Sequence, residues 1–204
     1  MLAIFDLDGT LTDSSNVLAN AINYVRAKLG LKPLPKEDII YQINNPNCNY
    51  LEYFYNTNTP NPIYEQWFKE YYSKHHNKDL VLFDGIKEML QELKSKNIKI
   101  AVATNGYNSS SKEALKHLQI DRYIDKLIGF DDVKEAKPAP DMLFKAIDEL
   151  YESPQTTIFI GDSDNDELAA KAANIKFIRV DFINKKDNPL QIAKKIEKEL
   201  GIIN

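Results

Sequence analysis

Cysteine is almost absent from this 204-residue sequence, and long hydrophobic runs are missing. The single cysteine, Cys48, excludes an intramolecular disulfide, which fits a protein of a reducing compartment. No apolar stretch is long enough to span a membrane, and the N-terminus lacks the basic segment that begins a secretory signal. We therefore expect a cytoplasmic protein with no membrane partner.

An excess of positive charge is missing too. Lys and Arg total 26 against 30 Asp and Glu, which leaves a formal net charge of −4. Because affinity for the phosphate backbone rests on clustered Lys and Arg, we expect no nucleic-acid partner. The three histidines show no metal-binding spacing such as HExxH. The sequence leaves both a monomer and a homodimer open.

What the sequence does contain is a series of short apolar runs rich in Ile, Val and Phe. They lie at residues 1–5, 98–103, 157–160 and 176–180, and a shorter run at 127–130 predicts one more strand. Such runs are typical of buried strands in a parallel sheet. Helical periodicity between them predicts helices over residues 85–95, 109–118, 142–150 and 166–173. The predicted fold class is therefore α/β, with a doubly wound, Rossmann-like parallel sheet.

Residues 14–82 break this alternation. They hold eight of the eleven tyrosines and the only tryptophan, and periodicity predicts helices over residues 14–29 and 64–75. We interpret this region as an inserted helical cap domain, with an aromatic stripe that forms its core. The predicted domains are an α/β core at residues 1–15 and 80–204 and a cap at residues 16–79.

Polar residues lie at the ends of three predicted strands and in one loop between them. They are Asp6, Asp8, Thr10, Thr104, Asn105, Lys137, Asp162 and Asp166. Ligand sites in open α/β sheets lie beyond the carboxyl ends of strands, so we expect these side chains at one edge of the sheet. Asp alone is common in turns, but four segments that together supply carboxylates, hydroxyls and a lysine indicate a site.

These residue types match the needs of phosphoryl transfer. The carboxylate of Asp6 can attack phosphorus, and Asp8 can protonate the leaving oxygen and later deprotonate water. Mg²⁺ prefers oxygen ligands, which Asp6, Asp162 and the main-chain carbonyl of Asp8 can supply. Lys137 and the hydroxyl of Thr104 can stabilise the charge on the phosphoryl oxygens.

Two neighbours complete the predicted site. Asn105 lies in a segment that leads into a helix N-terminus, where an anion is favoured, and we assign it to substrate binding. Thr10 is expected to orient Asp8 by a hydrogen bond.

The pattern resembles the haloacid dehalogenase superfamily of phosphatases. Asp6 to Thr10 is similar to its first motif, DxDGT, and Thr104 stands where its second motif has Thr or Ser. Lys137 with the proline after it matches the third motif, and residues 161–166 match the fourth, GDxxxD. Order and spacing agree over nearly the whole chain.

The resemblance implies roles for four carboxylates. Asp6 would be the nucleophile, Asp8 the acid and base, and Asp162 a metal ligand. Asp166 would support the metal site or orient Lys137. Dehalogenases of the superfamily lack the counterpart of Asp8, since they need neither a leaving-group acid nor a metal, so phosphoryl transfer is favoured here.

The insertion resembles the helical cap of the branch that includes phosphoglycolate phosphatases and β-phosphoglucomutases. The first two motifs are most similar to phosphoglycolate phosphatase-like members. The cap differs from them, because an Asn-rich segment at residues 44–49 stands where a Gly-containing specificity loop is expected. We hypothesise that Asn44 and Asn45 face the active site and bind substrate, the alternative being an ordinary surface turn.

The sequence thus predicts a Mg²⁺-dependent phosphomonoester hydrolase that acts on a small, phosphoglycolate-like phosphorylated metabolite through an aspartyl phosphate on Asp6. A β-phosphoglucomutase-like phosphomutase is the alternative among enzymes. A phospho-accepting signalling module is the alternative of another class, although receiver domains are shorter and carry no cap.

Overall fold

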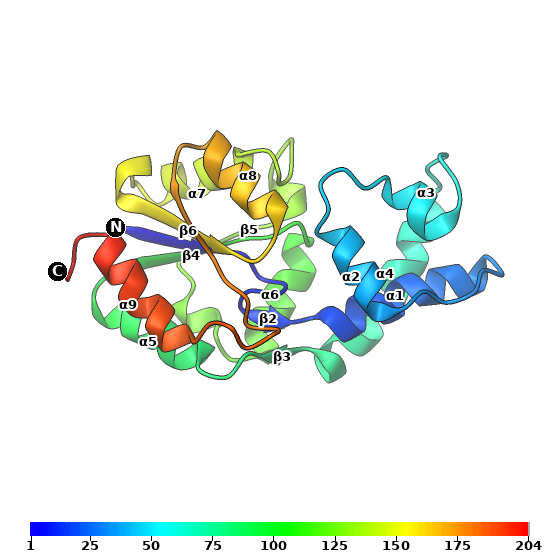
Figure 1. Cartoon of the computed structure of the whole chain (residues 1–204), viewed down its shortest axis with the longest axis horizontal. Helices are drawn as coiled ribbons and strands as arrows, with labels where there is room; N and C mark the ends of the chain where they lie inside the picture. Colours follow the sequence, from blue (N-terminus) through cyan, green and yellow to red (C-terminus); the bar gives the residue numbers. More distant parts are fainter. Residues whose placement is uncertain (204) are drawn as a thin grey trace. The chain divides into compact units, whose positions relative to one another are not determined.

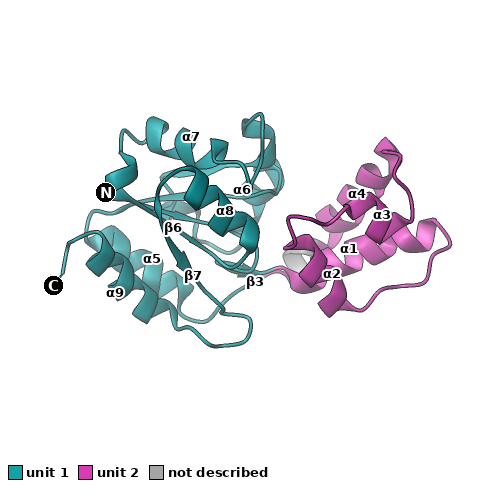
Figure 2. Cartoon of the chain, turned by 45° about the horizontal axis from the view of Figure 1, so that its top comes forward, with its two compact units in different colours: residues 1–13, 81–204 teal, residues 14–80 magenta. Residues whose placement is uncertain are grey.

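The computed structural model describes the backbone of residues 1–203 and their side chains except those of residues 76–79. The chain forms two compact units, drawn in two colours in Figure 2. Unit 1 comprises residues 1–13 and 81–204, and unit 2 comprises residues 14–80. The boundaries predicted from the sequence lie within two residues of these divisions.

Unit 1 is built on a five-stranded sheet with the order β5-β4-β1-β6-β7. The strands are β1 (Leu2–Phe5), β4 (Lys99–Ala103), β5 (Lys126–Ile128), β6 (Thr157–Gly161) and β7 (Lys176–Arg179). Each neighbouring pair is parallel, and Phe5 at the end of β1 lies opposite Val102 on one side and Ile160 on the other. Each of these strands overlaps a predicted apolar run, and the parallel sheet with its helices confirms the α/β fold class.

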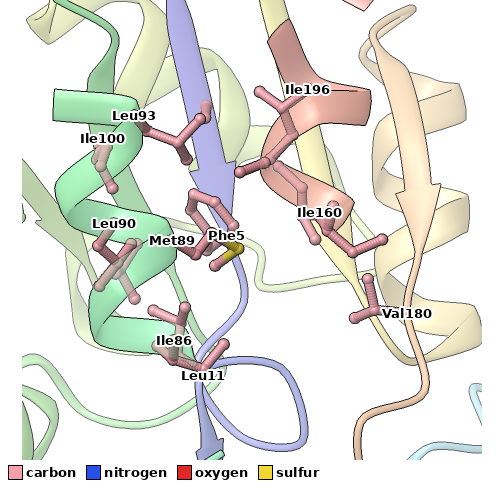
Figure 3. Close-up of a cluster of buried hydrophobic side chains, with 14 of the residues drawn as sticks. Phe5, Leu11, Ile86, Met89, Leu90, Leu93, Ile100, Ile160, Val180 and Ile196 are labelled. Atoms are coloured by element: carbon pink, nitrogen blue, oxygen red, sulfur yellow. The ribbon is translucent and has the colours of Figure 1, made fainter. Parts of the chain in front are cut away.

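Helices cover both faces of this sheet (Figure 1). They are α5 (Ile86–Ser95), α6 (Asn108–His117), α7 (Asp141–Glu149), α8 (Asp164–Ala172) and α9 (Pro189–Glu199), with short 3-10 turns η1 (Asp121–Tyr123), η2 (Phe130–Asp132) and η3 (Pro154–Thr156). Successive side chains of a strand point to opposite faces. Ala3 and Phe5 accordingly pack in the cluster with α5 and α9, which Figure 3 shows, while Leu2 and Ile4 pack with α7 and α8.

Two very short strands connect the sheet of unit 1 to the inserted segment. They are β2 (Thr12–Asp13) and β3 (Val81–Leu82), which pair antiparallel with Asp13 opposite Val81. The chain therefore leaves unit 1 and returns to it at a single place.

Unit 2 consists of helices α1 (Ser15–Lys28), α2 (Lys36–Ile43), α3 (Tyr50–Tyr55) and α4 (Pro62–Asp79). Its hydrophobic cluster contains Ala19, Ile22, Ile39 and Phe54. The sequence predicted α1 and α4, whereas α2 and α3 were missed because they are short and lie among Pro and Asn residues. Within the described residues, every helix is too short or too polar to cross a membrane.

Candidate active site

A tight turn follows β1 and presents Asp6 and Asp8. Leu11 N and Thr12 N both donate to Leu7 O at 2.9 Å, and Gly9 N donates to Thr12 O at 2.7 Å. Gly9 has a φ of +85°, and a Cβ atom there would lie 2.4 Å from the Asp162 Oδ2 atom. Two features therefore require glycine at position 9. Its backbone is in the left-handed region, and the Asp162 carboxylate lies where a side chain would be.

Lys137 links two carboxylates at this edge of the sheet. Its Nζ atom donates to Asp6 Oδ1 at 2.6 Å and to Asp166 Oδ1 at 2.7 Å. All three residues are buried, with exposed fractions of 6% for Lys137, 7% for Asp6 and 0% for Asp166. The structure thus brings together residues from the end of β1, the start of α8 and the loop before α7.

Asp166 is held from its other side by the start of α8. Ser163 caps this helix, and its Oγ and backbone N donate to Asp166 Oδ2 at 2.7 and 3.1 Å. A Cβ atom at Gly161 would lie 2.5 Å from the same carboxylate, so glycine is needed there too. With both oxygens engaged, Asp166 is placed to orient Lys137 rather than to bind a metal ion.

Asp162 is fixed through its side chain and its main chain. Thr10 Oγ1 donates to Asp162 Oδ1 at 2.9 Å, while the hydrogen bond from Thr10 to Asp8 stays a prediction. Arg179 Nη1 donates to the main-chain oxygen of Asp162 at 2.9 Å. Arg179 Nη2 also pairs with Asp164 Oδ1 and Glu167 Oε2, at 2.7 and 2.6 Å.

The sequence analysis missed Arg179. The only signal was a basic residue at the end of the last apolar run, and its role depends on the parallel register that places it opposite Gly161.

Burial sets the electrostatics of the cluster. It raises the pKa of Asp6 well above its usual value, against the opposing effect of Lys137, and the carboxylates of Asp166, Asp162 and Asp8 add to the rise. Burial also raises the pKa of Asp162 to about 7, with Asp166 adding to the rise and the Thr10 hydrogen bond opposing it. Burial alone would lower the pKa of Lys137, but Asp166 and Asp6 reverse this, and its pKa lies above the usual value.

The donor set fits a divalent cation. Asp6, Asp162 and Asp166 each offer an oxygen within 4.8 Å of the others. When ionised, these three carboxylates carry two more negative charges than the Lys137 ammonium, which is bonded to two of them, can offset. Mg²⁺ would offset this excess and takes oxygen ligands. Because Asp166 is already fully engaged, Asp6 and Asp162 are the side chains that fit it.

The second predicted motif continues from β4. Thr104 is buried, and its Oγ1 accepts a hydrogen bond from Gly106 N at 3.0 Å. The first amide of α6, Asn108 N, donates to Asp131 Oδ1 at 2.7 Å. The Asp131 carboxylate of η2 therefore accepts from one amide of the helix N-terminus that the sequence predicted to favour a substrate anion.

Asp8, Asn44 and Asn45 are the predicted site residues still to be placed. Asp8 lies half-buried in the turn after β1, close enough for its charge to raise the pKa of Asp6. Asn44 and Asn45 belong to unit 2, where Asn44 ends α2 and Asn45 Nδ2 donates to Gln42 Oε1 at 3.1 Å. Their contact with substrate stays a prediction.

Comparisons with known proteins agree with this geometry. A sequence profile described as haloacid dehalogenase-like hydrolase matches residues 3–180. The phosphoglycolate phosphatase of Aquifex aeolicus is 31% identical over 177 residues, covering 85% of this chain and 81% of that protein. The pyrophosphatase PpaX of Halalkalibacterium halodurans is 28% identical over 180 residues, covering 85% and 80%.

A solved structure gives the same result. The haloacid dehalogenase-like family hydrolase of Streptococcus pneumoniae matches with a TM-score of 0.79 at 26% identity, covering 95% of this chain and 97% of that one. These matches confirm the resemblance deduced from the four motifs. The chain therefore belongs to the haloacid dehalogenase-like hydrolases.

Proposed function

We propose that this hydrolase is a Mg²⁺-dependent phosphatase that removes the phosphoryl group of a small phosphate ester through an aspartyl phosphate on Asp6. The observation that carries the proposal is the buried, negatively charged cluster around Asp6, with Lys137 bonded to both Asp6 and Asp166. Relatives named as phosphatases and pyrophosphatases support the same reaction class.

In the first step an oxygen of Asp6 forms a bond to phosphorus, and the bond from phosphorus to the ester oxygen breaks. Asp8 gives its proton to that departing oxygen, which leaves as an alcohol. Asp8 then takes a proton from water, whose oxygen attacks phosphorus. The bond from phosphorus to Asp6 breaks, and inorganic phosphate leaves.

The remaining residues stabilise the negative charge on the phosphoryl group or fix the side chains around it. Lys137 and Thr104 stabilise the equatorial phosphoryl oxygens, and Thr10 keeps Asp162 in place. Asp6 and Asp162, with the main-chain carbonyl of Asp8, would hold Mg²⁺. That ion would offset the charge repulsion between the anionic nucleophile and an anionic substrate.

The proposal is tested with a panel of phosphate esters that includes p-nitrophenyl phosphate, phosphoglycolate and pyrophosphate. We expect release of inorganic phosphate by the wild type, and loss of at least about a thousandfold in kcat for Asp6→Asn with the fold retained. Acid-quenched wild-type enzyme should carry phosphate on the peptide that contains Asp6.

Turnover that survives in Asp6→Asn would overturn the mechanism. Transfer to a sugar phosphate without release of inorganic phosphate would favour the phosphomutase. A phosphorylated Asp6 that persists for minutes would favour the signalling module.

A further inference from the structure

Asn105 makes a reciprocal pair of hydrogen bonds with the main chain of Lys137. Its Nδ2 donates to Lys137 O at 2.9 Å, and Lys137 N donates to its Oδ1 at 3.1 Å. We propose that Asn105 is a positioning residue, which acts on the reaction by fixing Lys137 rather than chiefly by binding substrate as the sequence suggested. This inference rests on the proposed phosphatase function.

The chemistry of the amide explains why asparagine suits this place. A side-chain amide offers one donor group and one acceptor, which match the C=O and N–H of a single peptide residue. Aspartate offers acceptors alone and would face Lys137 O with a repelling oxygen. Alanine would leave both main-chain groups of a buried residue without this partner.

Lys137 needs such support because of where it lies. Between η2 and α7 the chain from Val133 to Pro140 forms no helix or strand, so no ladder of backbone hydrogen bonds fixes it. Ala139 N donates to Ala136 O at 2.9 Å and closes a turn around the lysine. The Asn105 pair then ties this turn to the end of β4.

The pair also links two groups expected to contact the phosphoryl oxygens. Thr104 precedes Asn105 and is anchored in the sheet, since Thr104 N donates to Ile128 O at 3.0 Å. The Nζ of Lys137 is held by Asp6 and Asp166. A lysine side chain has four rotatable bonds, so fixing its base as well as its tip restricts where the ammonium can lie.

A double-mutant cycle on p-nitrophenyl phosphate tests the proposal. We expect Asn105→Ala to lower kcat/KM by about tenfold to a hundredfold, as the loss of buried hydrogen bonds implies. Asn105→Asp should lose at least as much, although it keeps the shape of the side chain. In a Lys137→Gln background, Asn105→Ala should cost less than about twofold further, because the group it positions is already gone.

A direct contact with substrate predicts the opposite result, a full additional loss in the Lys137→Gln background, and that outcome overturns the proposal. Asn20→Ala makes the same replacement at an exposed position of α1 and serves as the control. It should change neither kcat/KM nor the melting temperature. A cooperative melting transition of Asn105→Ala above the assay temperature would show that its loss of activity is not a loss of fold.

A crystal structure of Asn105→Ala gives a second readout that needs no activity. Displacement of the Lys137 ammonium from Asp6 or Asp166 supports the proposal, and an unmoved ammonium overturns it. Because this readout is independent of turnover, it still decides the role of Asn105 if the Asp6→Asn experiment refutes phosphoryl transfer.

Discussion

Units 1 and 2 bury their side chains in different ways. Unit 1 encloses its sheet between two clusters made largely of Ile, Leu, Val and Ala. Among its described residues, unit 2 has one small cluster, and aromatic rings pack in a chain of pairs, such as Tyr55 with Tyr64 and Tyr64 with Trp67. A close-packed scaffold suits the fixed placement of charges. A small core with partly exposed aromatic residues leaves the amino-acid sequence of unit 2 freer to vary.

Polar burial differs between the units as well. Unit 1 buries carboxylates and a lysine together in the candidate active site. Unit 2 buries Arg26, whose Nε and Nη1 donate to the carbonyl oxygens of Lys32 and Phe54 at 2.8 and 2.5 Å. In unit 2 the buried charge ties helices together, and in unit 1 it is concentrated where chemistry is expected.

Removal of metal should have the largest effect, and it should act through unit 1. We expect EDTA to abolish hydrolysis of every ester and Mg²⁺ to restore it, because the cation offsets the excess negative charge around Asp6 and Asp162. Hydrogen exchange measured with and without Mg²⁺ should show added protection confined to the segments around these two residues. Full activity in EDTA would contradict the assignment.

A pair of large-to-small substitutions tests whether the two cores are separate. Leu90→Ala in the cluster beneath the sheet should lower the free energy of unfolding by about 2–5 kcal/mol. Phe54→Ala should instead accelerate hydrogen exchange in the helices of unit 2 and leave the sheet protected. Equal loosening of both units by either variant would mean that they share one cooperative core.

The free energy of unfolding of unit 1 should depend on pH because its site buries carboxylates close together. In metal-free protein the pKa of Asp162 is about 7, above its usual 3.8, so between these values the folded state binds more protons than the unfolded state. This group therefore favours folding below about pH 4 and loses that contribution as pH rises towards 7.

The matched variant is Asp162→Asn, which cannot titrate at this position. In EDTA its free energy of unfolding, relative to the wild type, should increase as the pH is raised from about 4 to 7. Denaturant titrations at several pH values measure the difference. A difference that does not change with pH would show that Asp162 keeps its ordinary pKa.

The smallest effect is expected in unit 2. Asn44→Ala and Asn45→Ala should each change the ratio of kcat/KM between two esters by about tenfold or less, the scale of one or two lost hydrogen bonds. Hydrolysis of p-nitrophenyl phosphate should stay near the wild-type rate. An unchanged profile across the panel would leave the segment 44–49 as an ordinary turn.

Local signals explain how much the sequence could predict. The strands of unit 1 were found because β-branched runs end at polar residues, and Asp6, Lys137, Asp162 and Asp166 meet because parallel strands end at one edge. The main-chain contacts of Asn105 and Arg179 were not predicted, since each joins segments that are distant in sequence. No local pattern carries that information.

The antiparallel pairing of β2 with β3 brings the two ends of the inserted segment together, so that the segment can be removed or replaced. Asp13 and Val81 lie opposite each other, at a separation of about 5 Å that is usual for such pairs. A two-residue turn such as Asn-Gly could join them in place of the whole segment 14–80. Excision of that segment therefore needs one new junction, exchange needs two that lie side by side, and both leave the order of the parallel strands intact.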